Sequence, residues 1–173
     1  MDRTRDQTKD RTRDQTMDRT HDRLTKQDRD RLRTQATDLQ RDQYKTCTGT
    51  MDRVRTQTRT MANSAKGSGF QVEEARRQHT QLQEELRTME QTRTQLHQSL
   101  NGEQQAAVQQ RMENMNQIHE RIQTRLQAMD QELNGQTVSG KRVSEQARAT
   151  EREMKAYQEQ FRKMGDDLGL KND

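Results

Sequence analysis

Two uninterrupted heptad patterns flank the short segment Leu100-Asn101-Gly102 and limit what this chain can fold into. In each pattern, mostly apolar residues recur at alternating spacings of three and four, which places them in one stripe along a helix. The first stripe, here called the first seam, comprises Val72, Ala75, His79, Leu82, Leu86, Met89, Arg93, Leu96 and Leu100. The second seam comprises Val108, Met112, Met115, His119, Ile122, Leu126, Met129 and Leu133. Two such helices joined by a short turn predict an all-α fold built on an antiparallel helical hairpin.

The hairpin is expected to span residues 71–134 and to turn at Leu100, Asn101 and Gly102. Asn101 can cap the second helix, with Gln104 three residues later as its capping-box partner. Gly102 allows a close turn because it carries no Cβ.

A third apolar series follows the hairpin after a break that contains Gly135 and Gly140. Each glycine would cost about 1 kcal/mol in a continuous helix. We therefore expect a hinge over residues 135–141, a C-terminal helix over 142–168 and a tail over 169–173. The spacing leaves open whether this helix folds back or continues the second helix. The series comprises Val143, Ala147, Met154, Tyr157, Phe161, Met164 and Leu168.

Residues 1–60 differ sharply from the remainder of the chain. Residues 2–8 recur unchanged as residues 10–16, a period of eight that fits neither repeat of supercoiled helices. All glutamates lie beyond Met61, and the basic excess lies before it. A low-complexity segment with so few apolar residues predicts a disordered arm over residues 1–60. Residues 61–70, which are mostly small, predict a flexible leader.

Three interpretations of this arm stay open. It could bind nucleic acid, although its aspartates offset most of the arginine charge and no aromatic residues are interleaved. It could be a flexible export or spacer arm. It could also be a translated DNA repeat, in which case Met61 would be the true start of the protein.

The amino-acid composition predicts that the chain associates with another chain. Only 25% of the residues are hydrophobic and Trp is absent, so one globular core of the usual size is not expected. An isolated hairpin would leave half of each seam exposed to water, which favours dimerisation into a four-helix bundle. Methionines in the seams would suit a surface that repacks against a related partner, or would fill gaps in the core. Whether the dimer is a homodimer or a heterodimer stays open.

Three polar residues occupy seam positions: His79, Arg93 and His119. No cysteine or carboxylate in the seams completes a zinc ligand set, so we expect the histidines to set register or pH sensitivity. Arg93 is expected to extend outward along its aliphatic stem or to pair with an acid on the partner chain. The lone Cys47 has no positioned base, and no catalytic constellation is evident. We therefore expect no metal, no cofactor and no enzymatic activity.

The sequence also bears on localisation. No window approaches the roughly 18 apolar residues of a membrane span. The N-terminus lacks the apolar region of a secretory signal. The expected location is the cytoplasm, or outside the cell after export without a cleaved signal peptide.

Residues 70–134 resemble the small Trp-x-Gly (WXG-like) helical-hairpin proteins of type VII secretion. Counted from Met61, the turn lies where that family bends, with Leu100 in place of the tryptophan. The family's apolar places that follow the bend correspond to Val108, Met112, Met115, Ile122, Leu126, Met129 and Leu133. The resemblance implies dimers, secretion without a cleaved signal and no enzymatic activity.

The family's export motif, Tyr-x-x-x-Asp/Glu, is incomplete here, because Phe161 stands four residues after Tyr157. An exported chain would then travel with a partner that carries the signal. The leading hypothesis is a dimerising type VII secretion-associated hairpin, whose partner is itself or a related hairpin. The alternatives are a cytoplasmic coiled-coil scaffold or adaptor and, less favoured, a nucleic-acid-binding protein that uses the basic arm.

Overall fold

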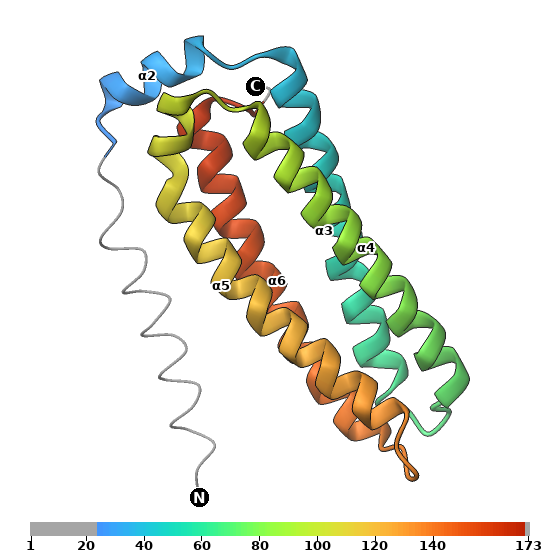
Figure 1. Cartoon of the computed structure of the whole chain (residues 1–173). Coiled ribbons are helices and arrows are strands. Elements are labelled where there is room, and N and C mark those ends of the chain that lie inside the picture. The colour runs from blue at the N-terminus through green and yellow to red at the C-terminus, as the bar shows by residue number, and fades with distance from the viewer. Residues whose placement is uncertain (1–23, 172–173) are drawn as a thin grey trace, which may run out of the picture.

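The computed structural model describes residues 24–171 of the chain (Figure 1). The predicted all-α class is confirmed, since these residues form helices and contain no strand. The helices are α2 (Lys26–Thr34), α3 (Asp38–Ser64), α4 (Val72–Ser99), α5 (Gly102–Leu133) and α6 (Gly140–Leu168).

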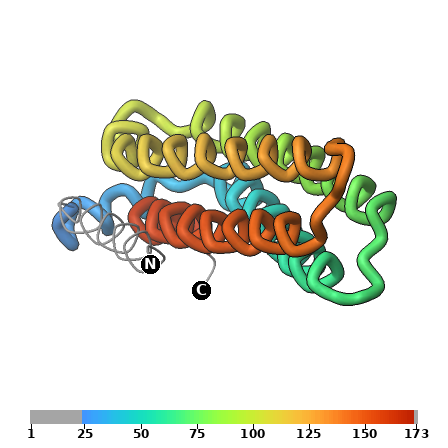
Figure 2. The backbone as a smooth tube through the Cα atoms, turned by 90° about the horizontal axis from the view of Figure 1, so that it is seen from below, coloured from blue at the N-terminus to red at the C-terminus, as the bar shows by residue number. Residues whose placement is uncertain are grey.

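The four long helices form a bundle within this single chain. Each runs antiparallel to the one before it, and α4 and α5 form one layer over a second layer of α3 and α6 (Figures 1 and 2). The closest pairings are α5 with α6, α3 with α4 and α3 with α6. Helices α4 and α5 contact each other much less, and α2 packs against α6 at one end of the bundle. The tight pairing expected between the two seam helices is therefore not what the structure shows.

The start of the second hairpin helix follows the local chemistry of the turn. The Asn101 side chain accepts a hydrogen bond from the Gln104 backbone amide at 2.9 Å. The Gln104 side chain accepts one from the Asn101 amide at 3.0 Å. This reciprocal pair satisfies two donors at the start of α5 and confirms the predicted capping box.

The expectation of a disordered arm is wrong for residues 24–60, which carry α2 and most of α3. Capping boxes start both helices, with Thr25 paired to Asp28 and Thr37 paired to Gln40. Helix α3 also carries a third heptad stripe, which was not predicted because Cys47 and Thr58 occupy two of its positions and because it extends to Met61, beyond the expected boundary at residue 60. Its buried residues are Tyr44, Cys47, Met51, Val54, Thr58 and Met61. Residues 1–23 of the expected arm lie outside the described residues.

The expected leader over residues 61–70 is also partly wrong. Helix α3 continues to Ser64, and Met61, Ala62 and Ala65 are buried. Met61 therefore lies inside a continuous helix rather than before the folded region. The residues on both sides of it contribute side chains to one core.

The third apolar series folds back along α5 as α6, which answers the question the sequence left open (Figure 1). The helix begins at Gly140, two residues before the expected start. A Cβ at Gly140 would lie 2.5 Å from the Ala65 carbonyl oxygen and 2.9 Å from the Phe70 ring. Glycine thus allows the start of α6 to lie against the segment that joins α3 to α4. Residues 172–173 of the expected tail lie outside the described residues.

Aromatic packing joins α3 to α6. The rings of Tyr44 and Phe161 stack with centroids 4.9 Å apart and planes 8° apart. Gly165, one turn beyond Phe161, leaves room for the Tyr44 ring, because a Cβ there would lie 2.4 Å from it. Among the described residues, no helix combines the length and apolar character needed to cross a membrane.

Replacing Gly165 with alanine should destabilise the bundle. The new Cβ would overlap a ring that is already fixed by stacking, and overpacking of this kind costs about 1–3 kcal/mol. Gly49→Ala is the matched control, because Gly49 also lies inside a helix but a Cβ there meets nothing within 4 Å. Gly49→Ala should stabilise the folded bundle by up to about 1 kcal/mol. Equal effects in urea denaturation would contradict the close packing of α3 on α6.

Candidate functional site

The apolar seam residues lie inside the bundle. On the first seam, Leu82, Leu86, Met89 and Leu96 are buried. On the second, Val108, Met115, Ile122, Leu126, Met129 and Leu133 are buried, and Met112 is half-buried against the core. Helix α3 packs on α4 and helix α6 packs on α5 within the same chain. The half-exposed seam that motivated the predicted dimer is therefore absent from the described structure.

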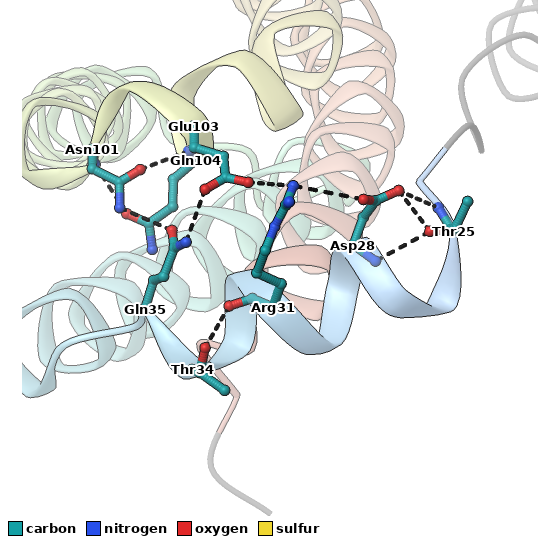
Figure 3. A network of polar contacts seen from close by, with 8 residues as sticks. All are labelled: Thr25, Asp28, Arg31, Thr34, Gln35, Asn101, Glu103 and Gln104. Atoms are coloured by element: carbon teal, nitrogen blue, oxygen red, sulfur yellow. Dashed lines mark hydrogen bonds and ion pairs between the residues drawn. The ribbon is translucent and has the colours of Figure 1, made fainter.

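The turn between α4 and α5 lies at the end of the bundle that α2 covers (Figure 1), and Asn101 lies close to α2 (Figure 3). Leu100 is buried, whereas Asn101 and Gly102 are exposed. The side-chain amide of Asn101 donates a hydrogen bond to the Gln35 side chain at 3.0 Å. Gln35 in turn donates to Glu103 at 2.8 Å, and Arg31 of α2 forms an ion pair with Glu103. Polar contacts thus hold α2 over the turn.

A buried amide extends this junction into α3. The Gln40 side chain donates to the Ser99 carbonyl oxygen at 2.7 Å and to the Gln104 side chain at 3.2 Å. Because the Ser99 carbonyl lies at the end of α4, Gln40 satisfies an acceptor that has no partner in its own helix. The turn between α4 and α5 is therefore packed against both α2 and α3.

The two seam histidines have different surroundings. His79 is buried, and its Nε2 lies 3.0 Å from the Leu126 carbonyl oxygen, while its Nδ1 lies 3.8 Å from Asp130. His119 is half-buried, and its Nδ1 lies 3.2 Å from Glu90. The structure therefore places one histidine as a link between helices and the other in a cluster of charged groups.

The cluster around Glu90 joins α4, α5 and α6. Arg93, one turn along α4, donates to the Glu90 carboxylate from Nε at 3.1 Å and from its terminal nitrogen at 2.7 Å. The Tyr157 hydroxyl of α6 donates to the same carboxylate at 2.8 Å. With His119 of α5 beside it, Glu90 receives contacts from three helices. The seam residue Arg93 thus pairs with an acid of its own chain.

These contacts determine how the groups ionise. Burial alone would raise the pKa of Glu90, but the contact with His119, the Arg93 charge and the Tyr157 hydroxyl together lower it to about 2. Burial, with the nearby Glu90 charge, raises the pKa of Tyr157 well above its usual value. Burial also raises the pKa of Cys47 to about 12. At neutral pH the cluster is an ionised carboxylate held by donors, which is a poor general base.

A cleft opens beside this cluster, between α4 and α5. Its volume is about 430 Å³. Its walls include Gln83 and Glu90 from α4 and His119 and Gln123 from α5. The cleft follows from the limited contact between these two helices. Within residues 24–171, no three His, Cys, Asp or Glu side chains are grouped so that they could hold a metal ion.

A larger groove lies between α3 and α6, with a volume of about 940 Å³. We call it the α3–α6 groove. Its apolar and small lining residues are Tyr44, Thr48, Gly49, Met51, Phe161 and Leu170. Its basic residues are Arg41, Lys45, Arg55, Lys155, Arg162 and Lys171, against the acids Asp52 and Glu159. The groove therefore has an apolar floor and a rim with an excess of positive charge, of which Arg41 and Lys171 are already paired with Asp38 and Asp166.

This groove does not follow from the sequence-based predictions, because they expect residues 1–60 to be disordered. The heptad stripe from Tyr44 to Met61 is the signal that could have predicted helix α3, which forms one side of the groove. A helix with that stripe has to pack on the bundle and creates a new boundary with α6.

Compared with protein-family models, with curated proteins and with solved structures, this chain matches none.

The Glu90 cluster predicts a specific loss of stability in acid. Because the folded-state pKa of about 2 lies below the usual 4.5, the ionised carboxylate stabilises the fold above pH 4.5. This contribution should disappear as the pH falls from 4.5 towards 2. Glu90→Gln should lower the free energy of unfolding at neutral pH by about 1–3 kcal/mol and flatten its pH dependence in that window.

The matched control is Glu84→Gln, which changes an exposed residue of the same helix. Urea denaturation at several pH values measures both effects. If the wild type and Glu90→Gln lost stability in parallel between pH 4.5 and 2, the assigned role of Glu90 would be wrong.

Proposed function

We propose that this chain is a non-enzymatic binding protein, an adaptor that holds a segment of a partner protein in the α3–α6 groove. The observation that carries the proposal is the groove itself, with an apolar floor and six basic residues against two acids. Its volume of about 940 Å³ falls within the range of established binding sites.

The ionisable cluster around Glu90 gives no reason to assign proton-transfer chemistry to these residues. Glu90, Arg93 and Tyr157 satisfy one another across two helices. The pKa of Glu90 is about 2 and that of Tyr157 is well above its usual value, so neither is set for proton transfer near neutral pH. We assign this cluster to holding the helices in register.

A second candidate function is that of a type VII secretion-associated protein exported without a cleaved signal peptide. The observation that favours it is the turn at Leu100-Asn101-Gly102 between two long helices, at the position where the Trp-x-Gly family bends. A dimer of this kind would have to form on the outside of the bundle, because the seams are filled by α3 and α6. Appearance of the chain in the culture medium only when the secretion system is active would support it.

The binding proposal predicts contacts that are confined to one face. A photo-crosslinking amino acid at Lys45, on the rim of the groove, should join the chain to a defined partner in cells that make the protein. The same amino acid at Gln109, an exposed residue of α5, is the matched control.

Mass spectrometry then identifies the partner peptide joined at each position. We expect one recurrent partner segment from Lys45 and none from Gln109. Indistinguishable products from both positions, or no product from Lys45, would contradict the proposal.

A further inference from the structure

We propose that the occupant of the α3–α6 groove is an acidic amphipathic helix of about four turns, with small residues where it crosses Gly49. This inference rests on the proposed function and names the chemistry of the partner segment. Three features of the groove carry it: its unpaired cations, its length and the open space over Gly49.

The charge on the rim calls for an anionic partner. Lys45, Lys155 and Arg162 are exposed, and within the described part of the chain they form no ion pair or hydrogen bond. The acid Asp52, by contrast, already accepts a hydrogen bond from Gln158 at 2.8 Å. Carboxylates on a bound segment would pair with cations on both edges of the groove, which favours acidic partners over basic ones.

The length of the rim fits a helix. The basic residues on α3 extend from Arg41 to Arg55, which corresponds to roughly 21 Å along a helix axis. The α6 edge supplies Lys155 and Arg162 across from them. A helix of about 14 residues has the same length and can present acids on both sides of one apolar stripe.

Gly49 lowers the α3 wall at the middle of the groove, because glycine carries no side chain there. It lies inside α3, where glycine costs about 1 kcal/mol relative to alanine, yet a Cβ there would meet nothing within 4 Å. The internal packing of the bundle therefore gives no reason for glycine at this position. A partner backbone that approaches α3 closely does give one, since small residues at a crossing allow close contact between helices.

The floor supplies only part of the apolar contact for the partner's stripe. Tyr44 and Phe161 form the stacked pair in the groove wall, and Met51 and Leu170 lie beside them. These side chains are almost completely buried, so the aliphatic stems of the rim lysines and arginines must provide part of the apolar contact. This balance predicts binding that depends strongly on charge and on salt.

The test uses the full chain and fluorescent, helix-stabilised peptides of about 14 residues. One peptide carries glutamates on both edges of an Ala/Leu stripe, and its control carries lysines in place of the glutamates. Fluorescence anisotropy should show at least ~10-fold tighter binding of the acidic peptide at low salt, and a weakening of that binding at high salt.

Variants locate the site. Lys45→Glu combined with Arg162→Glu should weaken binding of the acidic peptide by at least ~10-fold, because both edges of the groove reverse charge. Arg87→Glu combined with Lys141→Glu is the matched control, since both of those residues are exposed and lie outside the groove. Gly49→Leu should also weaken binding while leaving the fold intact, because its side chain would extend into open space.

Equal affinity for the acidic and basic peptides would overturn the inference. Binding of unstructured polyglutamate as tightly as the acidic helix would also overturn it, because the groove would then be a general anion surface. If Gly49→Leu bound the acidic peptide as tightly as the wild type, the partner backbone would not approach α3 closely at Gly49, and that part of the inference would be wrong. If these peptides fail while Lys45 still forms crosslinks in cells, the groove binds a partner of different chemistry and the proposed function stands.

Discussion

The apolar stripe of α3 packs against α4 and α6 at once, and the burial of both seams depends on that contact. Cys47, Met51 and Val54 are completely or almost completely buried there, and the Cys47 thiol lies 3.7 Å from the Met89 carbonyl oxygen of the first seam. Without α3, one face of α4 and one face of α6 would be open to water, and a helical hairpin would need a second chain to cover them. With α3 in place, a chain with few hydrophobic residues closes a four-helix bundle by itself.

The Glu90 cluster adds specificity to this packing. Apolar stripes at heptad spacing allow neighbouring helices to slide by one repeat, whereas the Glu90 carboxylate of α4 can accept from the Tyr157 hydroxyl of α6 in only one position. The contact with His119 brings α5 into the same register. The junction of Gln40 with the α4–α5 turn serves the same purpose at the end of the bundle. Polar contacts therefore fix an arrangement that the apolar contacts favour only in general terms.

The sequence predicted the features that depend on local chemistry. The ends of α4 and α5 and the capping box at Asn101 follow from helix periodicity and capping alone. Helix α3 was not predicted because Cys47 and Thr58 are not typical core residues and because they follow a repetitive, low-complexity segment. The pairing of helices could not be predicted, since heptad spacing tells which face is buried but not which helix buries it. The α3–α6 groove depends on that pairing, and so it appears only in the structure.

The reactivity of the single cysteine tests the docking of α3 most directly. Cys47 lies on the buried stripe with no exposed surface, and burial raises the pKa of its thiol to about 12. With a thiol-specific reagent at mildly alkaline pH, the native chain should react at least about 100-fold more slowly than the denatured chain, because the thiol becomes accessible only when α3 opens. Reaction of the native chain as fast as that of the denatured chain would show that α3 does not close the bundle, and would contradict this account.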